Sequence, residues 1–376
     1  MNAKRAVTIR ELAQAAGVSI GTVSRALKGQ SGLSEETRAE VLAVAQRLGY
    51  DTAKLRTGKP RRVLFLYRRS LGSLLSNDFY SVVLHGAETA CREHGVPLSL
   101  MSVAAGDDIA AQVRRHESEA LIGAGYFDPE LMETIRKCEL PLVLVDHFYP
   151  GVRSINDDNL SGAWLATRHL LEGGAKRVAA IFGPHEHHSV ALRAKGFRRA
   201  LFEAGRLFDP DYEITLDPTQ DYRDAGHEAM RRLLDLPEPP DAVFAYNDST
   251  ALHAMEICHE RGLRIPEDIR FVGYDDIGLA AHAKPPLSTV RVDNAALGHV
   301  AACVLIEGDA ALAEALLPVE LVVRESSRIE PAPRARKAAQ KPATKVATKV
   351  ATKAATKAAP KAAPKPAAKA KSKPRR

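Results

Sequence analysis

The stretch VTIRELAQAAGVSIGTVSRAL, residues 7–27, decides the fold of the N-terminal part of this 376-residue chain. Thr8 and Glu11 have the spacing of a capping box, and apolar residues then recur at helical spacing, which predicts a helix over about 9–16. The glycine that follows suits the left-handed position of a tight turn, and Ser19 can cap a second helix. The stretch therefore predicts two short helices joined by a tight turn.

A third helix completes this N-terminal unit, with Ser34 as its expected cap and Gly49 as its end. Three short helices with a tight glycine turn between the first two are typical of a helix-turn-helix domain. The exposed face of the second helix offers polar donors and no acidic residue: Thr22, Ser24, Arg25 and Lys28. Such side chains bind phosphates and base edges, so we expect a DNA-binding headpiece over residues 1–50 rather than a small bundle with another role.

The charge of the chain is distributed unevenly along it. Residues 1–62 carry 12 Lys or Arg and 5 acidic residues, whereas residues 63–330 carry 26 and 41. Residues 331–376 carry 15 Lys or Arg and no acidic residue, so the formal net charge of +7 hides an acidic centre between two basic ends. The two ends are suited to polyanions, whereas the centre by itself should not bind DNA.

The composition argues against membrane proteins and common enzyme classes. No apolar run approaches the roughly 18–20 residues of a membrane span, and residues 1–10 lack the apolar core of a signal peptide. The four cysteines lie far apart without a CxxC pair, so we expect reduced thiols and no zinc ribbon. No P-loop, GxSxG, HExxH or dinucleotide fingerprint is present, and we expect no catalytic residues, no cofactor and no metal. His185, His187 and His188 could form a metal site, but we expect a polar loop near the mouth of a cleft instead.

Residues 63–330 alternate between short apolar runs and helical patterns. This alternation predicts parallel sheets covered by helices, with ligands at the carboxyl ends of the strands. A length of about 270 residues suits two such lobes. The expected strands are 63–67, 120–124, 141–145, 178–182, 242–245 and 269–274. The expected helices are 79–95, 128–138, 162–173, 190–204, 223–235 and 249–261.

Polar residues directly follow three of the expected strands. Asp146 follows one strand, Asn247 and Asp248 follow another, and Asp275 and Asp276 follow a third. Each such residue is by itself more often a helix N-cap than a ligand group. Three sets at the same edge of parallel sheets nevertheless favour a cleft for a hydroxyl-rich small ligand, because sugars need hydrogen-bond acceptors and bidentate donors.

The N-terminal part of the chain resembles the headpiece of the lactose-repressor (LacI) family of bacterial transcription regulators. The resemblance lies in residues 7–27, in SEETR at 34–38 and in LGY at 48–50. By that resemblance, the positions that read bases in the major groove are Ile20, Gly21 and Arg25. The positions that contact phosphates are Thr8, Ser19, Thr22 and Ser24. Arg25 can donate a bidentate pair to guanine, worth about 1–3 kcal/mol of discrimination, whereas Gly21 reads nothing directly. We therefore expect operator specificity to depend on Arg25, packing and DNA shape.

Residues 51–62 correspond to a shortened form of the family's hinge. The segment LRTGK at 55–59 matches the end of a family hinge helix, but a Pro-Asn pair is absent. About four residues, roughly one helical turn, are missing before the match. The resemblance makes Leu55 the candidate for the leucine that wedges into the minor groove and kinks the operator. A basic linker that lies along phosphates is the alternative that the shortening leaves open.

The resemblance continues through the body to about residue 329, with landmarks that include NDFY at 77–80, DNLSGA at 158–163 and PPLSTV at 285–290. It implies the two-lobed fold of periplasmic sugar-binding proteins. The implied lobes are about 63–156 with 289–316, and about 157–288 with 317–330. The family's effector contacts fall on Phe79, Asp146, Arg193, Tyr222, Asn247 and Asp275. A pocket with one arginine and several acids suits a neutral sugar, a sugar acid or a phosphosugar.

The last segment, residues 331–376, repeats lysine every four residues from Lys341 to Lys369. It lacks the apolar residues needed to bury a core and resembles the tails of linker-histone-like bacterial proteins. We expect a disordered polycation whose affinity for DNA falls as salt rises. A solubilising tail without a further role is the alternative.

The sequence as a whole predicts a cytoplasmic, nucleoid-associated transcription regulator, in the first instance a repressor of sugar-metabolism genes. We expect a homodimer on a pseudo-palindromic operator of double-stranded DNA, controlled by a small sugar-like effector and without a membrane partner. An architectural DNA-binding protein dominated by the basic tail is the main alternative. A metabolite sensor that has lost operator binding is the second alternative, and an enzyme is the third.

Overall fold

The computed structural model describes residues 8–27, 33–48, 59–68, 77–308 and 316–328. The predictions made for Lys28, for Leu55 and for the basic tail lie outside these residues. Within the described residues, no helix has the length and apolar character needed to cross a membrane.

The headpiece consists of three helices, α1 (Ile9–Ala15), α2 (Ile20–Leu27) and α3 (Glu35–Arg47). The capping box is present: the Thr8 amide donates to Glu11 Oε2 at 2.7 Å, and the Glu11 amide donates to Thr8 Oγ1 at 3.4 Å. Gly17 adopts φ +65°, so the turn has the left-handed residue that the sequence predicts. The core of the headpiece is formed by Leu12, Ala13, Val23, Ala26, Leu27, Val41, Val44 and Ala45.

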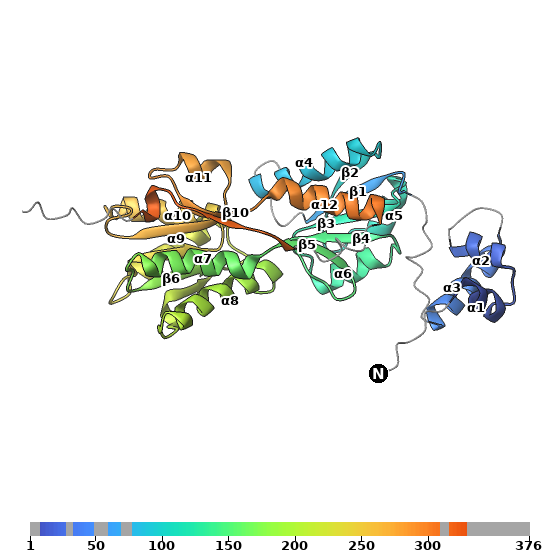
Figure 1. The fold of residues 1–376 in the computed structure, drawn as a ribbon, viewed down its shortest axis with the longest axis horizontal. Helices are drawn as coiled ribbons and strands as arrows, with labels where there is room; N and C mark the ends of the chain where they lie inside the picture. The colour runs from blue at the N-terminus through green and yellow to red at the C-terminus, as the bar shows by residue number, and fades with distance from the viewer. Residues whose placement is uncertain (1–7, 28–32, 49–58, 69–76, 309–315, 329–376) are drawn as a thin grey trace, which may run out of the picture. The chain divides into compact units, whose positions relative to one another are not determined.

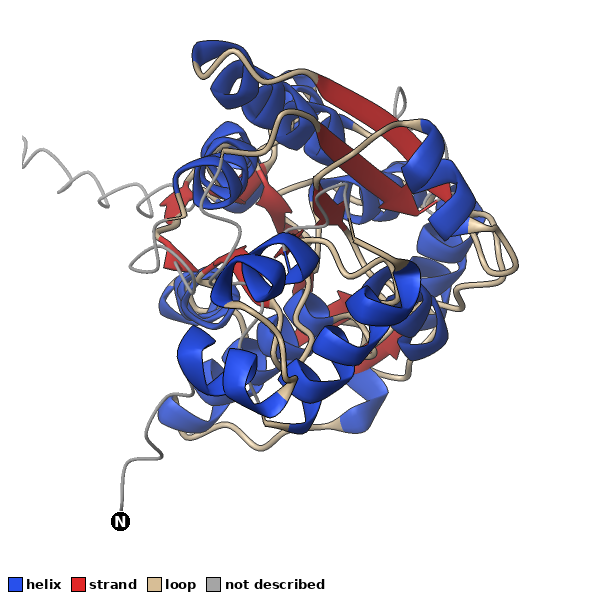
Figure 2. Cartoon of the chain, turned by 90° about the vertical axis from the view of Figure 1, so that its right-hand side faces the viewer, coloured by secondary structure: helices blue, strands red, loops and turns tan. Residues whose placement is uncertain are grey.

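The first sheet has the strand order β11-β5-β4-β3-β1-β2, and its paired strands are all parallel. Its strands are β1 (Val63–Arg68), β2 (Leu98–Val103), β3 (Ala120–Ala124), β4 (Leu142–Val145), β5 (Arg153–Asp157) and β11 (Leu316–Leu317). The helices of this lobe are α4 (Asp78–Glu93), α5 (Ile109–Arg115), α6 (Pro129–Arg136) and α12 (Asn294–Glu307). The apolar runs of the central strands are fully buried, as Figure 2 shows for strands that lie between layers of helix.

The second sheet has the order β12-β10-β9-β8-β6-β7, with only β12 antiparallel to its neighbour. Its strands are β6 (Val178–Phe182), β7 (Glu213–Thr215), β8 (Ala242–Ala245), β9 (Arg270–Asp275), β10 (Ser288–Arg291) and β12 (Glu320–Val322). Its helices are α7 (Asn159–Glu172), α8 (His188–Glu203), α9 (Tyr222–Leu234), α10 (Asp248–Glu260) and α11 (Gly278–His282). Two short 3-10 turns, η4 (Pro210–Tyr212) and η6 (Glu325–Ser327), accompany them. The predicted fold class, a helix-turn-helix headpiece with two α/β lobes, is confirmed.

The chain crosses between the two sheets three times. The first crossing lies between β5 and α7, the second between β10 and α12, and the third between β11 and β12. The expected return to the first lobe at residue 289 is wrong, because β10 stays in the second sheet through Arg291, where it pairs with Asp275 of β9. The hydrogen-bond ladder with β9 therefore keeps the chain in the second lobe for three further residues.

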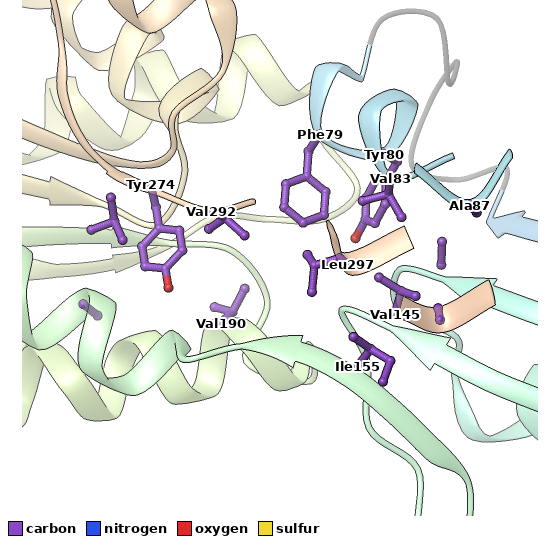
Figure 3. Packing of buried hydrophobic residues seen from close by; sticks show 14 of the residues in the cluster. Phe79, Tyr80, Val83, Ala87, Val145, Ile155, Val190, Tyr274, Val292 and Leu297 are labelled. Atoms are coloured by element: carbon purple, nitrogen blue, oxygen red, sulfur yellow. The ribbon is translucent and has the colours of Figure 1, made fainter. Parts of the chain in front are cut away.

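Close helix packing supports the first lobe. Helices α4 and α12 lie against each other, and a Cβ on Gly298 of α12 would overlap the carbonyl oxygen of Val83 in α4. Gly86 meets the carbonyl of Ala295 in the same way. Figure 3 shows part of the apolar cluster at these helices, to which Val83 of α4 and Leu297 of α12 both belong. Glycine is needed at both positions because any side chain would force the two helices apart.

Candidate functional sites

The second headpiece helix, α2, presents the surface that the sequence assigns to DNA. Ile20 is 47% exposed, and Gly21 and Arg25 are exposed beside it. The Arg25 Nε group donates to the Gly21 carbonyl at 3.4 Å, which leaves the end of the guanidinium available. A Cβ on Gly21 would find its nearest neighbour, Ser19 Oγ, at 3.7 Å, an ordinary contact. The fold of the headpiece therefore leaves space for a side chain at position 21 and does not require glycine there.

Two of the four predicted phosphate-contacting hydroxyls, those of Thr8 and Ser19, cap the starts of helices. Thr8 Oγ1 donates to Glu11 Oε2 at 2.9 Å, and Ser19 Oγ accepts from the Thr22 amide at 3.0 Å. Ser24 is half-buried on α2. Helix N-termini attract anions, so capped helix starts with free amides are suitable places for phosphate.

Asp146 and Asp275 lie at the carboxyl ends of strands in different sheets. Asp146 directly follows β4 and adopts φ +55°, and Asp275 ends β9 with φ +105°. Neither residue is a helix N-cap, so the alternative that they are capping groups does not hold for these two. Both carboxylates are buried, and one oxygen of each has no hydrogen-bond partner among the described residues. Left-handed backbone at a non-glycine residue costs free energy, and it is typical of functional sites.

Arg193, on α8, forms the centre of this region. Its Nε donates to Asn159 Oδ1 at 2.7 Å, its Nη1 donates to the Tyr246 carbonyl, and its Nη2 lies 3.4 Å from Asp275 Oδ1. The guanidinium also lies over the Tyr274 ring, 3.6 Å from its centroid. The arginine is only 4% exposed and is therefore rigidly held. Two of its five N–H groups make these hydrogen bonds, so others remain to bind a ligand.

Asn247 and Tyr222 lie in one hydrogen-bonded group. Asn247 Oδ1 accepts from the Thr250 amide at 2.9 Å and so caps α10, while its Nδ2 donates to the Tyr222 hydroxyl. The Tyr222 hydroxyl also lies 2.6 Å from that of Tyr246. For Asn247 the N-cap interpretation is thus correct, and its side chain positions Tyr222, which is 39% exposed.

Phe79 is only 8% exposed and packs at the start of α4 against Tyr80, with ring centroids 4.9 Å apart. Tyr80 in turn donates a 2.6 Å hydrogen bond to Asp146 Oδ2. Figure 3 shows both rings beside Val145, with Tyr274 in the other lobe. Phe79 thus supports the site mostly from within the core. We call the six sequence-predicted residues and their direct partners the interlobe site.

The three histidines of the loop before α8, which are His185, His187 and His188, contact different partners. The His187 Nε2 lies 3.8 Å from Asp146 Oδ2, and the ring of His188 stacks on Phe148 with centroids 5.1 Å apart. His185 instead lies 3.8 Å from Glu213. Burial lowers the pKa of His187 and of His188, so both rings favour the neutral form. Through His187 and His188 the loop contacts residues of the first lobe.

Sequence reasoning missed several residues of the interlobe site. Tyr274 donates to Asp157 Oδ2 at 2.6 Å, and Asp157 accepts from Asn159, the residue that holds Arg193. Burial raises the pKa of Asp157 and raises that of Asp275 well above its usual range. Asn159 stands inside the quoted DNLSGA motif and Tyr274 directly precedes Asp275, yet nothing local distinguishes either residue from core residues.

Comparisons with known proteins agree with this geometry. The model of bacterial regulatory proteins of the lacI family matches residues 8–53, and a periplasmic binding protein-like domain matches residues 167–327. The transcriptional repressor CytR of Escherichia coli K12 is 30% identical over 352 residues, which cover 88% of this chain and 100% of CytR. The chain belongs to the lacI family. It is therefore a transcription regulator with a DNA-binding headpiece.

Other members of the lacI family are similar along most of the chain. The regulator CelR of Thermobifida fusca is 32% identical over 342 residues, or 86% of this chain and 97% of CelR. The structure of a CelR–cellobiose complex matches with a TM-score of 0.65 and 29% identity, covering 85% of this chain and 99% of that one. A lac repressor dimer bound to operator and the anti-inducer ONPF matches with a TM-score of 0.62 and 26% identity, covering 86% and 99%. These relatives are regulators rather than enzymes.

Proposed function

We propose that this chain is a repressor controlled by a sugar or sugar derivative that binds at the interlobe site. The observation that carries the proposal is the pair of buried oxygens, Asp146 Oδ1 and Asp275 Oδ1, which come from different lobes and accept no hydrogen bond from any described residue. Within the described part of the chain, Asp275 Oδ1 has only the ion-pair contact with Arg193. Sugar hydroxyls donate to such carboxylates and accept from an arginine such as Arg193. The cellobiose complex of CelR, and a lacI-family regulator of Enterococcus faecium with bound ribose (26% identity, TM-score 0.61), support this ligand class.

The parts of the chain have distinct proposed roles. The headpiece, residues 1–50, binds the operator, and residues 51–62 connect it to the body. The body, residues 63–330, binds the effector and forms a homodimer, so that two headpieces read a pseudo-palindrome. The basic tail, residues 331–376, adds salt-sensitive affinity for any DNA. The structure of the lac repressor dimer bound to its operator supports the roles proposed for the headpiece and for the body.

Effector control follows from contacts between the lobes. His187 of the second lobe lies against Asp146 and against the Tyr126 ring of the first, at a centroid distance of 5.7 Å from the ring. A ligand between the carboxylates adds interactions that exist in only one arrangement of the lobes. The ligand therefore shifts the lobes toward that arrangement, and the headpieces prefer DNA in one of the two.

The proposed location is the cytoplasm, at the nucleoid. The architectural alternative, in which the tail dominates, has no support from the repressors and regulators that this chain resembles. A specific regulator occupies few sites, whereas an architectural protein covers DNA broadly. Genome-wide occupancy of the full-length protein distinguishes them, and broad coverage without a shared palindrome would overturn the proposal.

Selection of binding sites from random DNA tests the headpiece. The wild-type protein should return one palindromic consensus, and Arg25→Ala should lower the preference for that consensus by about 10- to 100-fold. Arg136→Ala, which removes an exposed arginine of the body, is the matched control for total charge. An unchanged consensus and affinity for Arg25→Ala would contradict the assignment of α2.

Calorimetric titration with a panel of neutral sugars, sugar acids and phosphosugars tests the interlobe site. One class should bind with one ligand per chain, and Asp275→Asn should abolish that binding while operator affinity without ligand is retained. Asp235→Asn, an exposed acid paired with Arg261, is the matched control. Retained ligand affinity in both Asp275→Asn and Asp146→Asn would place the pocket elsewhere.

A further inference from the structure

A second group of polar side chains lies at the C-terminal ends of α4 and α12, away from the interlobe site. The two helices lie side by side, as Figure 1 shows, and run in the same direction. Helix α4 has 16 residues and is therefore about 24 Å long, which separates its C-terminal end from the tyrosine that contacts Asp146. This end of the lobe contains histidine, cysteine and glutamate side chains that the proposed function does not use.

The spacing on α12 places three potential metal ligands on one face. His299, Cys303 and Glu307 recur at intervals of four residues, so they line up along the helix. His94, the C-cap of α4, approaches the same face, and its Nε2 lies 2.7 Å from Glu307 Oε1. One ligand atom each of His94, Cys303 and Glu307 lies within 4.8 Å of the others. The Nδ1 of His299 lies 3.6 Å from Cys303 Sγ and adds a fourth candidate.

Both histidines are oriented as metal-binding histidines are. The His94 Nδ1 lies 2.9 Å from the Ala90 carbonyl, an acceptor that requires the proton on Nδ1. The His299 Nε2 lies 3.1 Å from Glu93 Oε2, which places its proton on the nitrogen away from the group. The other nitrogen of His94 lies beside Glu307, and the other nitrogen of His299 lies beside Cys303. An acceptor that fixes the far nitrogen in this way is the usual second contact of a histidine ligand.

We propose that His94, His299, Cys303 and Glu307 form a binding site for a transition-metal ion of the zinc type. Two imidazoles, a thiolate and a carboxylate are a donor set that suits tetrahedral zinc. An ion pair between a protonated His94 and Glu307 explains that contact alone. It does not explain why the Cys303 sulfur lies within 4.8 Å of both groups, nor why the lone-pair nitrogen of His299 lies against that sulfur.

The position of the site connects it to the headpiece linker. Lys59, the first described residue of the linker, donates through Nζ to the carbonyl of His94. Burial raises the pKa of the Cys303 thiol, and Glu307 and Glu93 act in the same direction.

The test is titration of the tag-free, full-length protein with Co²⁺ after removal of bound metal by a chelator. We expect one Co²⁺ per chain, a sulfur-to-cobalt charge-transfer band and the strong visible bands of tetrahedral cobalt, all displaced by Zn²⁺. Cys303→Ser should abolish the charge-transfer band, and His94→Gln should lower affinity by about 100-fold or more. Glu93→Gln, which changes only the partner of His299, should lower it by about 10-fold.

Cys138→Ser is the matched control, because Cys138 is a partly buried thiol of the same lobe outside the group. Circular dichroism spectra establish that each variant is folded. Binding without a sulfur band, a band that persists in Cys303→Ser, or the same loss in Cys138→Ser would each overturn the proposal. A metal content well below one per chain after equilibration with Zn²⁺ would overturn it as well.

Discussion

Replacement of Arg193 by methionine tests whether this buried arginine holds the interlobe site together. Methionine keeps an unbranched apolar stem that can lie against the ring of Tyr274, but it removes the charge and both hydrogen bonds of the guanidinium. The carboxylate of Asp275 then loses the cation 3.4 Å away, and Asp157 and Asp146 lose a nearby positive charge.

The size of the expected loss in the free energy of unfolding follows from how deeply the two residues are buried. Arg193 is 4% exposed and Asp275 is 8% exposed, so water cannot replace the lost partner. Removal of one member of a buried ion pair costs about 3–5 kcal/mol. The cost should be smaller at low pH, because the remaining carboxylates become protonated. Burial raises the pKa values of Asp157 and Asp275, and loss of the arginine acts in the same direction, so the folded variant binds more protons as pH falls and the deficit relative to wild type shrinks.

Urea unfolding followed by circular dichroism measures this deficit near neutral pH and near pH 5. The matched control is Arg199→Met, an exposed arginine on the same helix that pairs with Glu203 and should cost less than about 1 kcal/mol. A loss below about 1 kcal/mol for Arg193→Met, or an equal loss at both pH values, would refute the reasoning.

Three further predictions concern single positions. Gly298→Ala should lower the free energy of unfolding by about 1–3 kcal/mol, because the new Cβ would overlap a backbone carbonyl of α4. The control Gly278→Ala adds a Cβ in open space and should change that free energy by less than about 0.5 kcal/mol, as chemical unfolding of the two variants would measure. Gly21→Ala should leave the headpiece folded and alter operator preference, so selection that returns the wild-type consensus would contradict it. Burial raises the pKa of Asp248 from 3.8 to about 7, so wild-type stability should fall as pH rises through that window. Asp248→Asn should flatten the profile, and equal slopes in both proteins would count against the assignment.

Most secondary structure was predictable because its signals are local. The strands at 120–124, 178–182 and 242–245 match the prediction residue for residue, since each is a continuous apolar run that begins directly after a charged residue. Helix α12 was not predicted, because it is apolar almost all round and therefore shows no helical periodicity. It is buried on several sides, between α4 and the first sheet. A pattern of amphipathicity exists only where one face of an element meets water.

The site was predicted in part, and mainly through the resemblance to a family. Polar residues after apolar strands indicated Asp146 and Asp275, because the carboxyl ends of parallel strands meet at one edge. The same signal also indicated Asn247, which is a helix cap. The two roles differ only in whether a side chain turns toward its own helix or toward the other lobe.

The sequence by itself determined the headpiece with its caps, the alternation of strands and helices, and the acidic centre between two basic ends. The caps, strands and helices depend on residues within one or two turns of each other, and the charge distribution is a sum over the sequence that needs no structure. Only the tertiary structure brought Tyr274 to Asp157, across 117 positions, and His94 to Glu307, across 213. Hydrogen bonds and ion pairs act over a few ångströms, so their partners are decided by how the chain crosses between its lobes. No local pattern records those crossings.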